Sequence, residues 1–135
     1  MQTRPRAIAL ALAVLVFVGG LAGCSTASDA VTDVSASEAV KVLAEPDLTV
    51  IDVRTPAEFD SGHLDGAINI DIEGNSFDQQ VADLPKDGAY FVYCRSGNRS
   101  GTATDHLVKL GFTHIYDLQG GITDWQASGG AVVKS

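Results

Sequence analysis

The chain has 135 residues, which is room for one globular domain rather than two. Its 17 acidic and 9 basic side chains give a formal net charge of −8. This excess of carboxylates argues against a nucleic-acid partner, because proteins that neutralise phosphates concentrate Lys and Arg. Hydrophobic residues make up 45% of the chain, so the composition is that of a folded protein, and two cysteines exclude a disulfide-rich scaffold. No spacing of Cys and His resembles a metal site, and we expect neither a metal nor an organic cofactor.

The first residues have the form of a secretory signal peptide. Arg4 and Arg6 precede an apolar run at residues 7–18, which is too short to cross a ~30 Å hydrocarbon core. The run is followed by LAGC at residues 21–24, which resembles the lipobox of bacterial lipoproteins. That resemblance implies an extracytoplasmic protein held at the cell membrane or the periplasmic face by a lipid on Cys24. An ordinary signal peptide cut a few residues later and an uncleaved anchor are the alternatives.

These observations divide the chain into three segments. Residues 1–23 are the expected signal peptide, which cleavage would remove. Residues 24–32 are small and polar, and we interpret them as a lipidated tether. Residues 33–135 are the expected domain, and a chain of this length can bury one hydrophobic core.

The domain begins with alternating helices and strands. Residues 35–38 (SASE) have the form of a capping box and predict a helix that ends before Pro46. The apolar, β-branched run at 48–53 predicts a buried strand, and residues 55–59 (TPAEF) predict a helix with Pro at its first position. The next expected elements are a short strand at 67–70 and a short helix at 77–84.

The second half continues this alternation. A strand at residues 89–93 leads directly into CRSGNRS at residues 94–100. A helix follows and is expected to end at Gly111, and then come a strand at 114–118 and a short helix that carries Trp125. Strands that alternate with helices predict an α/β fold. We expect a three-layer sandwich whose central sheet has about five mostly parallel strands, with helices on both faces.

The loop at residues 94–100 has the features of a thiolate site. Cys94 stands at the carboxyl end of a strand, where active groups gather in parallel sheets. It also comes just before a helix, whose N-terminal N–H groups and partial positive charge favour thiolate over thiol. Gly97 permits a positive φ where the loop turns. Only three arginines follow residue 6, and two of them, Arg95 and Arg99, lie in this loop. Their guanidinium groups suit a sulfur oxyanion, and Cys94 is the expected nucleophile.

The domain resembles the rhodanese family of single-domain sulfurtransferases over about residues 32–130. The resemblance is carried by VIDVR at 50–54 with EF at 58–59, GHLDGAIN at 62–69, CRSGNRS at 94–100, LGF at 110–112, and LQGGI at 118–122 with Trp125. It implies that Cys94 takes a sulfane sulfur from a small anionic donor such as thiosulfate, becomes a persulfide and passes the sulfur to a thiol or cyanide. The residues that would cradle the sulfur and its charged adducts are Arg95, Ser96, Gly97, Asn98, Arg99 and Ser100.

Other activities stay open at this point. Cysteine phosphatases and arsenate reductases also act through a cysteine, and the phosphatase loop places five residues between its cysteine and its arginine. Four residues separate Cys94 from Arg99, and this smaller ring suits a sulfur adduct better. A sulfur-relay or binding module would hold the persulfide without turning over thiosulfate. A thiol-redox role ranks lower, because a lipidated Cys24 leaves no second thiol to resolve a disulfide.

Several other polar residues are interpreted as structural. Asp52, Arg54 and Glu58 are expected to form an ion-paired scaffold near a strand end. His63 is expected to make hydrogen bonds within a turn. Arg99 has two candidate roles, binding substrate or locking the loop through hydrogen bonds to carbonyl groups.

Overall fold

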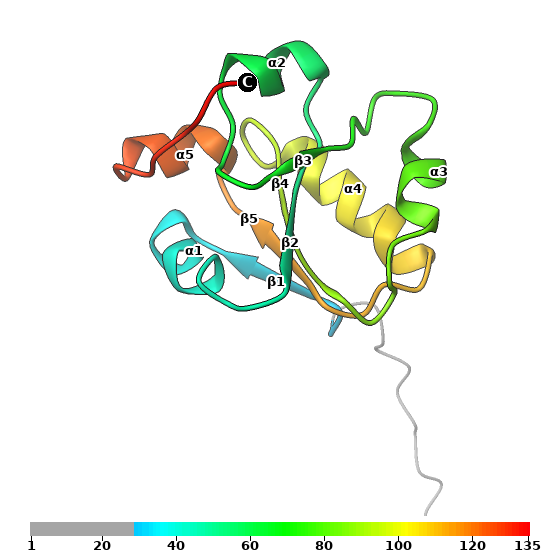
Figure 1. The fold of residues 1–135 in the computed structure, drawn as a ribbon. Coiled ribbons are helices and arrows are strands. Elements are labelled where there is room, and N and C mark those ends of the chain that lie inside the picture. The colour runs from blue at the N-terminus through cyan, green and yellow to red at the C-terminus, as the bar shows by residue number, and fades with distance from the viewer. Residues whose placement is uncertain (1–28) are drawn as a thin grey trace, which may run out of the picture.

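The computed structural model describes residues 29–135 of the chain (Figure 1). The expected signal peptide, the expected lipidation site Cys24 and the greater part of the expected tether lie outside the described residues. Within residues 29–135, no helix is both long enough and apolar enough to cross a bilayer.

One parallel sheet organises the domain. Its five strands lie in the order β1-β5-β4-β2-β3, and every neighbouring pair is parallel. The strands are β1 (Val31–Val34), β2 (Leu48–Asp52), β3 (Ile68–Asn69), β4 (Ala89–Tyr93) and β5 (Ile115–Leu118). The helices are α1 (Ala36–Val42), α2 (Pro56–Ser61), α3 (Phe77–Ala82), α4 (Asn98–Lys109) and α5 (Gly121–Ala127).

Helices cover both faces of this sheet, which confirms the expected three-layer α/β sandwich. Helices α1 and α5 lie on one face, and α3 and α4 lie on the other (Figure 1). Side chains of β4 alternate between the two layers, as the period of a strand requires. Phe91 and Tyr93 pack in the α1/α5 layer, whereas Tyr90 and Val92 pack in the α3/α4 layer. Because β4 is central and buried on both faces, its carboxyl end is a rigid place from which to present Cys94.

The expected helices and strands are present, and their observed bounds fall within the expected ranges except in α2, which continues two residues further, to Ser61. The expected capping box forms, because the Ser35 N–H donates to Glu38 Oε2 at 2.8 Å. A second capping box starts α2, where the Thr55 N–H donates to Glu58 Oε2 at 3.1 Å. Gly111 follows the last turn of α4 with a φ of +94°, the left-handed conformation expected at that position.

Strand β1 differs from the sequence analysis. Val31 and Thr32 fall within the expected tether, but the structure places both in β1, which pairs with β5. The domain therefore begins before residue 33. The reason is that β1 is an edge strand whose middle residues, Thr32 and Asp33, are exposed, so the segment lacks the apolar run of a buried strand.

Candidate active site

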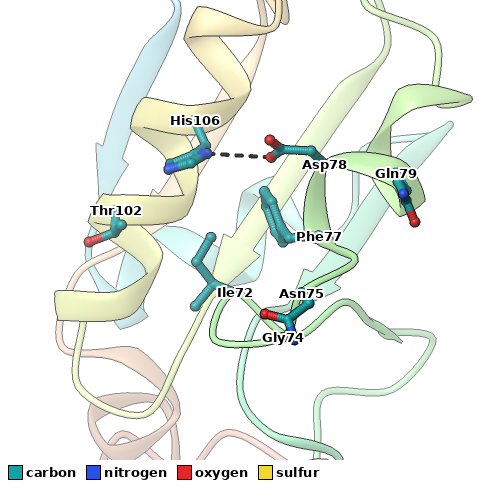
Figure 2. A pocket seen from close by; sticks show the side chains of 8 residues that line it. All are labelled: Ile72, Gly74, Asn75, Phe77, Asp78, Gln79, Thr102 and His106. Carbon is teal, nitrogen blue, oxygen red and sulfur yellow. Dashed lines mark ion pairs between the residues drawn. The ribbon is translucent and has the colours of Figure 1, made fainter.

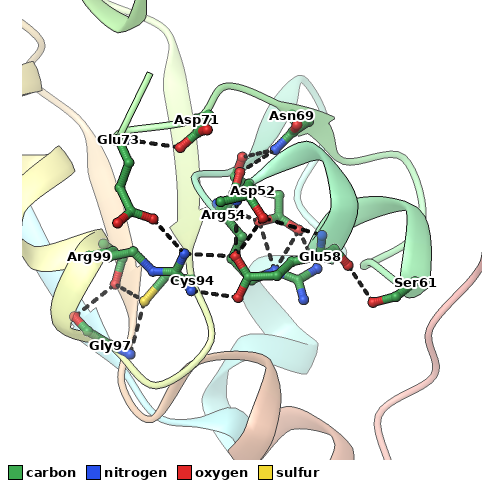
Figure 3. A network of polar contacts seen from close by, with 12 residues as sticks. Asp52, Arg54, Glu58, Ser61, Asn69, Asp71, Glu73, Cys94, Gly97 and Arg99 are labelled. Carbon is green, nitrogen blue, oxygen red and sulfur yellow. Dashed lines mark hydrogen bonds and ion pairs between the residues drawn. The ribbon is translucent and has the colours of Figure 1, made fainter. Parts of the chain in front are cut away.

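Cys94 lies directly beyond the carboxyl end of β4, and its side chain faces the loop that leads into α4 (Figure 3). The backbone N–H of Gly97 donates a hydrogen bond to Cys94 Sγ at 3.0 Å. Ser100 Oγ lies 3.7 Å from the same sulfur, and its hydroxyl donates to the carbonyl oxygen of Gly97 at 3.0 Å. Two of the loop residues, Gly97 and Ser100, therefore lie around the sulfur atom.

The start of α4 supplies the polarity of this ring. Gly97 is the N-cap and has a φ of +103°, a left-handed conformation that glycine adopts without steric cost. No side chain caps this helix. The N–H groups of its first turn and its partial positive charge therefore remain available to a negatively charged group held in the loop.

Cys94 is nevertheless almost completely buried, with 1% of its surface exposed. On the α4 side it packs within the apolar cluster that includes Val92 and Ala103. Sγ thus has an apolar surrounding on the core side and hydrogen-bonding groups on the loop side. Cys94 differs from an inert buried cysteine, because a backbone N–H group donates its hydrogen bond to the sulfur and not to a carbonyl oxygen.

Arg99 does not lock the loop through carbonyl groups. Its guanidinium forms a two-pronged contact with Glu58, with Nη1 at 2.8 Å from Oε2 and Nη2 at 2.8 Å from Oε1. Nη1 also donates to Glu73 Oε2 at 3.0 Å (Figure 3). The two carboxylates offset the positive charge of Arg99, so less of that charge is available to an anionic substrate than the sequence analysis expected.

Glu58 connects two helices at once. Its Oε2 atom accepts hydrogen bonds from the N–H and the hydroxyl of Thr55, which completes the capping box of α2. The same carboxylate holds Arg99 in the first turn of α4. The hydrogen bond from Arg99, helped by those from Thr55 and opposed by partial burial, lowers the pKa of Glu58 from 4.5 to about 2. The expected ion-paired scaffold of Asp52, Arg54 and Glu58 is therefore only partly present, because Glu58 pairs with Arg99 and not with Arg54.

The remaining pair of that scaffold is confirmed and lies deep in the protein. Arg54 donates from Nη2 to Asp52 Oδ2 at 2.6 Å and to the carbonyl oxygen of Gly62 at 2.7 Å. Asp52 is fully buried and Arg54 is 5% exposed. Asn69 donates to the carbonyl oxygens of both residues at 3.0 and 2.8 Å. This network joins the carboxyl end of β2 to β3 and to Gly62 after α2, and we assign it a structural role.

Arg95, Ser96 and Asn98 form the exposed side of the loop. Helix α5 holds the backbone beneath them: Ile122 N–H donates to the carbonyl oxygen of Cys94 at 2.9 Å, and Thr123 N–H donates to that of Arg95 at 3.1 Å. The backbone of the loop is thus anchored from the opposite side of the sheet, while the Arg95 side chain extends into solvent.

Gly121, at the start of α5, approaches this backbone closely. Its φ is +61°, and a Cβ atom at this position would lie 2.5 Å from the carbonyl carbon of Arg95 and 2.6 Å from the carbonyl oxygen of Cys94. No side chain fits there without moving the loop. The glycine at position 121 therefore permits the close contact between α5 and the cysteine loop.

The histidines lie apart from the sulfur. His63 accepts or donates a hydrogen bond through Nδ1 to the carbonyl oxygen of Phe59 at 2.9 Å, which confirms its role in a turn. His106 pairs with Asp78 across 3.4 Å at a hollow of about 340 Å³ between α3 and α4 (Figure 2). The residues that line this hollow do not include Cys94.

Three residues near the site were not predicted from the sequence. Glu73, which contacts Arg99, and Gly121, which contacts the loop, are distant from Cys94 in sequence and carry no local signal. Asp117 is 4% exposed within β5, and a carboxylate inside an otherwise apolar strand was a signal that the sequence did contain.

Comparison with known proteins places these features in a family. The family model of the rhodanese-like domain matches residues 35–128. Over 76 residues the chain is 41% identical to the uncharacterized protein YqhL of Bacillus subtilis, and the match covers 56% of this chain and 59% of YqhL, less than two thirds of its length. Over 92 residues it is 34% identical to thiosulfate sulfurtransferase GlpE of Pseudomonas aeruginosa, which covers 68% of this chain and 82% of GlpE. A crystal structure of a rhodanese-related protein from Thermoplasma volcanium matches with a TM-score of 0.67 and 34% identity, covering 76% of this chain and 98% of that chain.

Replacing Glu58 with glutamine should destabilise the protein at neutral pH by about 1–2 kcal/mol, because the change weakens both the Arg99 contact and the α2 cap. The folded-state pKa of Glu58 lies below its ordinary value of 4.5, so its contribution is complete above that pH and is lost as the pH falls toward about 2. The difference in Tm between wild type and E58Q should therefore shrink as the pH is lowered from 7 to about 3.5. Thermal unfolding followed by circular dichroism measures this difference.

The matched control is Glu73→Gln. Glu73 contacts the same guanidinium, but its side chain is 59% exposed and takes no part in a helix cap. E73Q should change the Tm much less than E58Q at pH 7. Equal effects of the two substitutions would contradict the role assigned to Glu58.

Gly121→Ala should cost about 2–4 kcal/mol of folding free energy, because a left-handed backbone and an overpacked contact are both penalised. Gly129→Ala is the control: its φ is +87°, but no atom lies within 4 Å of the added Cβ. It should cost only about 1–2 kcal/mol, the backbone contribution. Urea unfolding of both variants measures the difference in folding free energy. Equal losses of folding free energy would show that Gly121 is not in close contact with the backbone of the loop.

Proposed function

The chain belongs to the rhodanese-like domain family, and from this premise we propose that it is a thiol sulfurtransferase that moves a sulfane sulfur from a donor such as thiosulfate to a thiol or cyanide through a persulfide on Cys94. The observation that carries the proposal is the 3.0 Å hydrogen bond from the Gly97 N–H to Cys94 Sγ at the start of α4. A loop that donates to the sulfur stabilises a negative charge there, both on the thiolate and on the persulfide.

The first half-reaction loads the enzyme. The Cys94 thiolate attacks the outer sulfur of thiosulfate, so that a bond forms between Sγ and this sulfur. The bond between the two sulfur atoms of thiosulfate breaks, and sulfite leaves with its electron pair. The persulfide that remains carries one negative charge on its terminal sulfur, next to the N–H groups at the start of α4.

The second half-reaction unloads the enzyme. A thiolate or cyanide attacks the terminal sulfur, the bond to Sγ breaks, and Sγ keeps the electron pair as a thiolate. The hydrogen bond from Gly97 that stabilises the starting thiolate also stabilises this leaving group. The acceptor carries the sulfur away as a persulfide or as thiocyanate, and the enzyme returns to its initial state.

Attraction of the anionic donor is assigned to Arg95 and the backbone. Arg99 is bound by two carboxylates, whereas the Arg95 side chain is exposed on the loop. This distribution also disfavours a cysteine phosphatase, in which an arginine must turn its guanidinium toward the phosphate. In this protein, both terminal nitrogens of the Arg99 guanidinium already donate hydrogen bonds to Glu58.

The burial of Cys94 bears on the sulfur-relay alternative. With 1% of the residue exposed, a donor must bring its sulfur into the loop before it can react. A small anion does so more readily than a persulfide on a folded partner. This observation favours turnover of a small donor over the relay or binding module.

Incubation with thiosulfate should add the mass of one sulfur atom to Cys94, and cyanide should remove it with release of thiocyanate. Cys94→Ser should abolish both reactions, because a serine hydroxyl is a poor nucleophile and forms no persulfide. Mass spectrometry of tryptic peptide 87–95 and a thiocyanate assay measure the two steps. The control is Cys24→Ser in the full chain, which should retain sulfur transfer.

Two other outcomes would count against the proposal. Thiocyanate formation by the C94S variant would contradict the mechanism. A persulfide that forms from a protein donor but never from thiosulfate would support the relay module instead.

We also propose that the protein is an extracytoplasmic lipoprotein held to the membrane through Cys24. Only the sequence supports this, since Cys24 lies outside the described residues. Mass spectrometry of the protein isolated from the cell membrane should find an N-terminal Cys24 that carries diacylglycerol. An unmodified Cys24 thiol would contradict the proposal.

A further inference from the structure

The guanidinium of Arg99 is held by two carboxylates, and these ion pairs lie beside the cysteine loop. Glu58 contacts Nη2 at 2.8 Å, and Glu73 contacts Nη1 at 3.0 Å. Arg99 precedes Ser100, whose Oγ lies 3.7 Å from Cys94 Sγ (Figure 3). Both acidic groups therefore belong to the electrostatic surroundings of the reacting sulfur.

Glu73 faces solvent, yet its backbone is anchored. Its side chain is 59% exposed. The preceding residue, Ile72, donates its N–H to the carbonyl oxygen of Val53 at 3.1 Å, and the N–H of Glu73 donates to Asp71 Oδ1 at 2.9 Å. The turn between β3 and α3 therefore holds this carboxylate against Arg99 without the help of burial.

The charged side chains of the loop and of its ion pairs balance one another. Glu58 and Glu73 together outweigh Arg99 by one negative charge. The exposed guanidinium of Arg95 offsets that charge, so these four side chains sum to zero. The attraction that remains for an anion comes from the start of α4, with a partial positive charge of about half an elementary charge, and a Cys94 thiolate opposes it. Such surroundings accommodate a donor with one negative charge better than a donor with two.

We propose that Glu73 is a specificity-determining residue, whose charge disfavours doubly charged thiosulfate relative to donors that carry one negative charge. The favoured class is a small organic monoanion that ends in a sulfane sulfur. The inference rests on the proposed function, because it assumes that Cys94 accepts a sulfane sulfur, and it narrows the class of donor.

The test compares two donors of similar size that differ by one charge. Methanethiosulfonate has a methyl group where thiosulfate has an oxygen with a second negative charge. The Cys94 thiolate attacks the terminal sulfur of either donor, the bond between the two donor sulfur atoms breaks, and methanesulfinate or sulfite leaves with the electron pair. Mass spectrometry of the peptide that contains Cys94 measures the rate constant of persulfide formation in the full chain.

Glu73→Gln should raise the rate constant ~3-fold for methanethiosulfonate and ~9-fold for thiosulfate at low ionic strength. The second gain is the square of the first, because the Coulomb energy of a dianion with the removed charge is twice that of a monoanion. Both gains should shrink as the salt concentration is raised to ~0.5 M, since the side chain of Glu73 is exposed to solvent.

The matched control is Glu45→Gln. Glu45 is exposed between α1 and β2, at the amino end of the sheet, where its carboxylate accepts a hydrogen bond from the Tyr116 hydroxyl. E45Q changes the net charge of the protein by the same amount as E73Q and should leave both rate constants unchanged. Arg95→Gln should have the opposite effect to E73Q and lower the rate constant for thiosulfate more than that for methanethiosulfonate. It also serves as the second test if E73Q disturbs the fold.

Alkylation of Cys94 gives a second readout that needs no sulfur donor. Iodoacetamide is neutral, iodoacetate carries one negative charge, and both alkylate a thiolate with loss of iodide. E73Q should raise the ratio of the iodoacetate rate constant to the iodoacetamide rate constant ~3-fold, as for methanethiosulfonate. The ratio cancels any change in the ionised fraction of Cys94.

Equal gains for the two donors in E73Q would overturn the proposal, and so would gains of the same size in E45Q. An unchanged alkylation ratio in E73Q would overturn it as well. If this ratio rises but neither donor forms a persulfide, the proposed function is overturned, and Glu73 retains its selectivity for the charge of an anion that enters the loop.

Discussion

The contact between the Gly97 N–H and Cys94 Sγ is the interaction on which the rest of the site depends. It requires a left-handed backbone at Gly97, a helix that starts immediately afterwards, and a strand that ends at Tyr93. Each of these is a backbone property, and the N–H groups of the loop and of the first turn of α4 place a partial positive charge close to the sulfur. The side chains around the loop then hold this backbone in place. Sulfur chemistry in this fold is therefore first a matter of main-chain geometry, and the arginines come second.

Two supports hold that geometry from opposite sides. Helix α5 donates hydrogen bonds to the carbonyl oxygens of Cys94 and Arg95, and it approaches closely because Gly121 has no side chain. On the other side, Arg99 ties the first turn of α4 to Glu58 on α2. Since both contacts join the loop to distant segments of the chain, the loop takes its shape only when the whole sandwich has folded. This explains why a short loop with few buried side chains can position a sulfur atom reliably.

Much of this architecture was predictable from the sequence, and the exceptions have physical reasons. The capping box at Ser35, the helix that begins with Pro56, and the buried strand 89–93 are local patterns, and the structure confirms them. Strand β1 was not predicted because an edge strand can be polar. The partner of Glu58 was not predictable, because 41 residues separate it from Arg99 and the nearer candidate was Arg54. Asp117 is a carboxylate within an apolar strand, which the sequence does show, but the layer that it faces follows only from the packed structure.

The Glu58 carboxylate makes contacts with two helices, and this links their conformations. One oxygen atom completes the first turn of α2 and also receives the guanidinium from α4. If an oxyanion drew Arg99 away from this oxygen, Oε2 would keep its hydrogen bonds from Thr55 but would lose the guanidinium that holds it in place. Binding of an oxyanion in the loop and the rigidity of the start of α2 are then thermodynamically linked. A change that makes the start of α2 more rigid also opposes the reorientation of Arg99 at the start of α4.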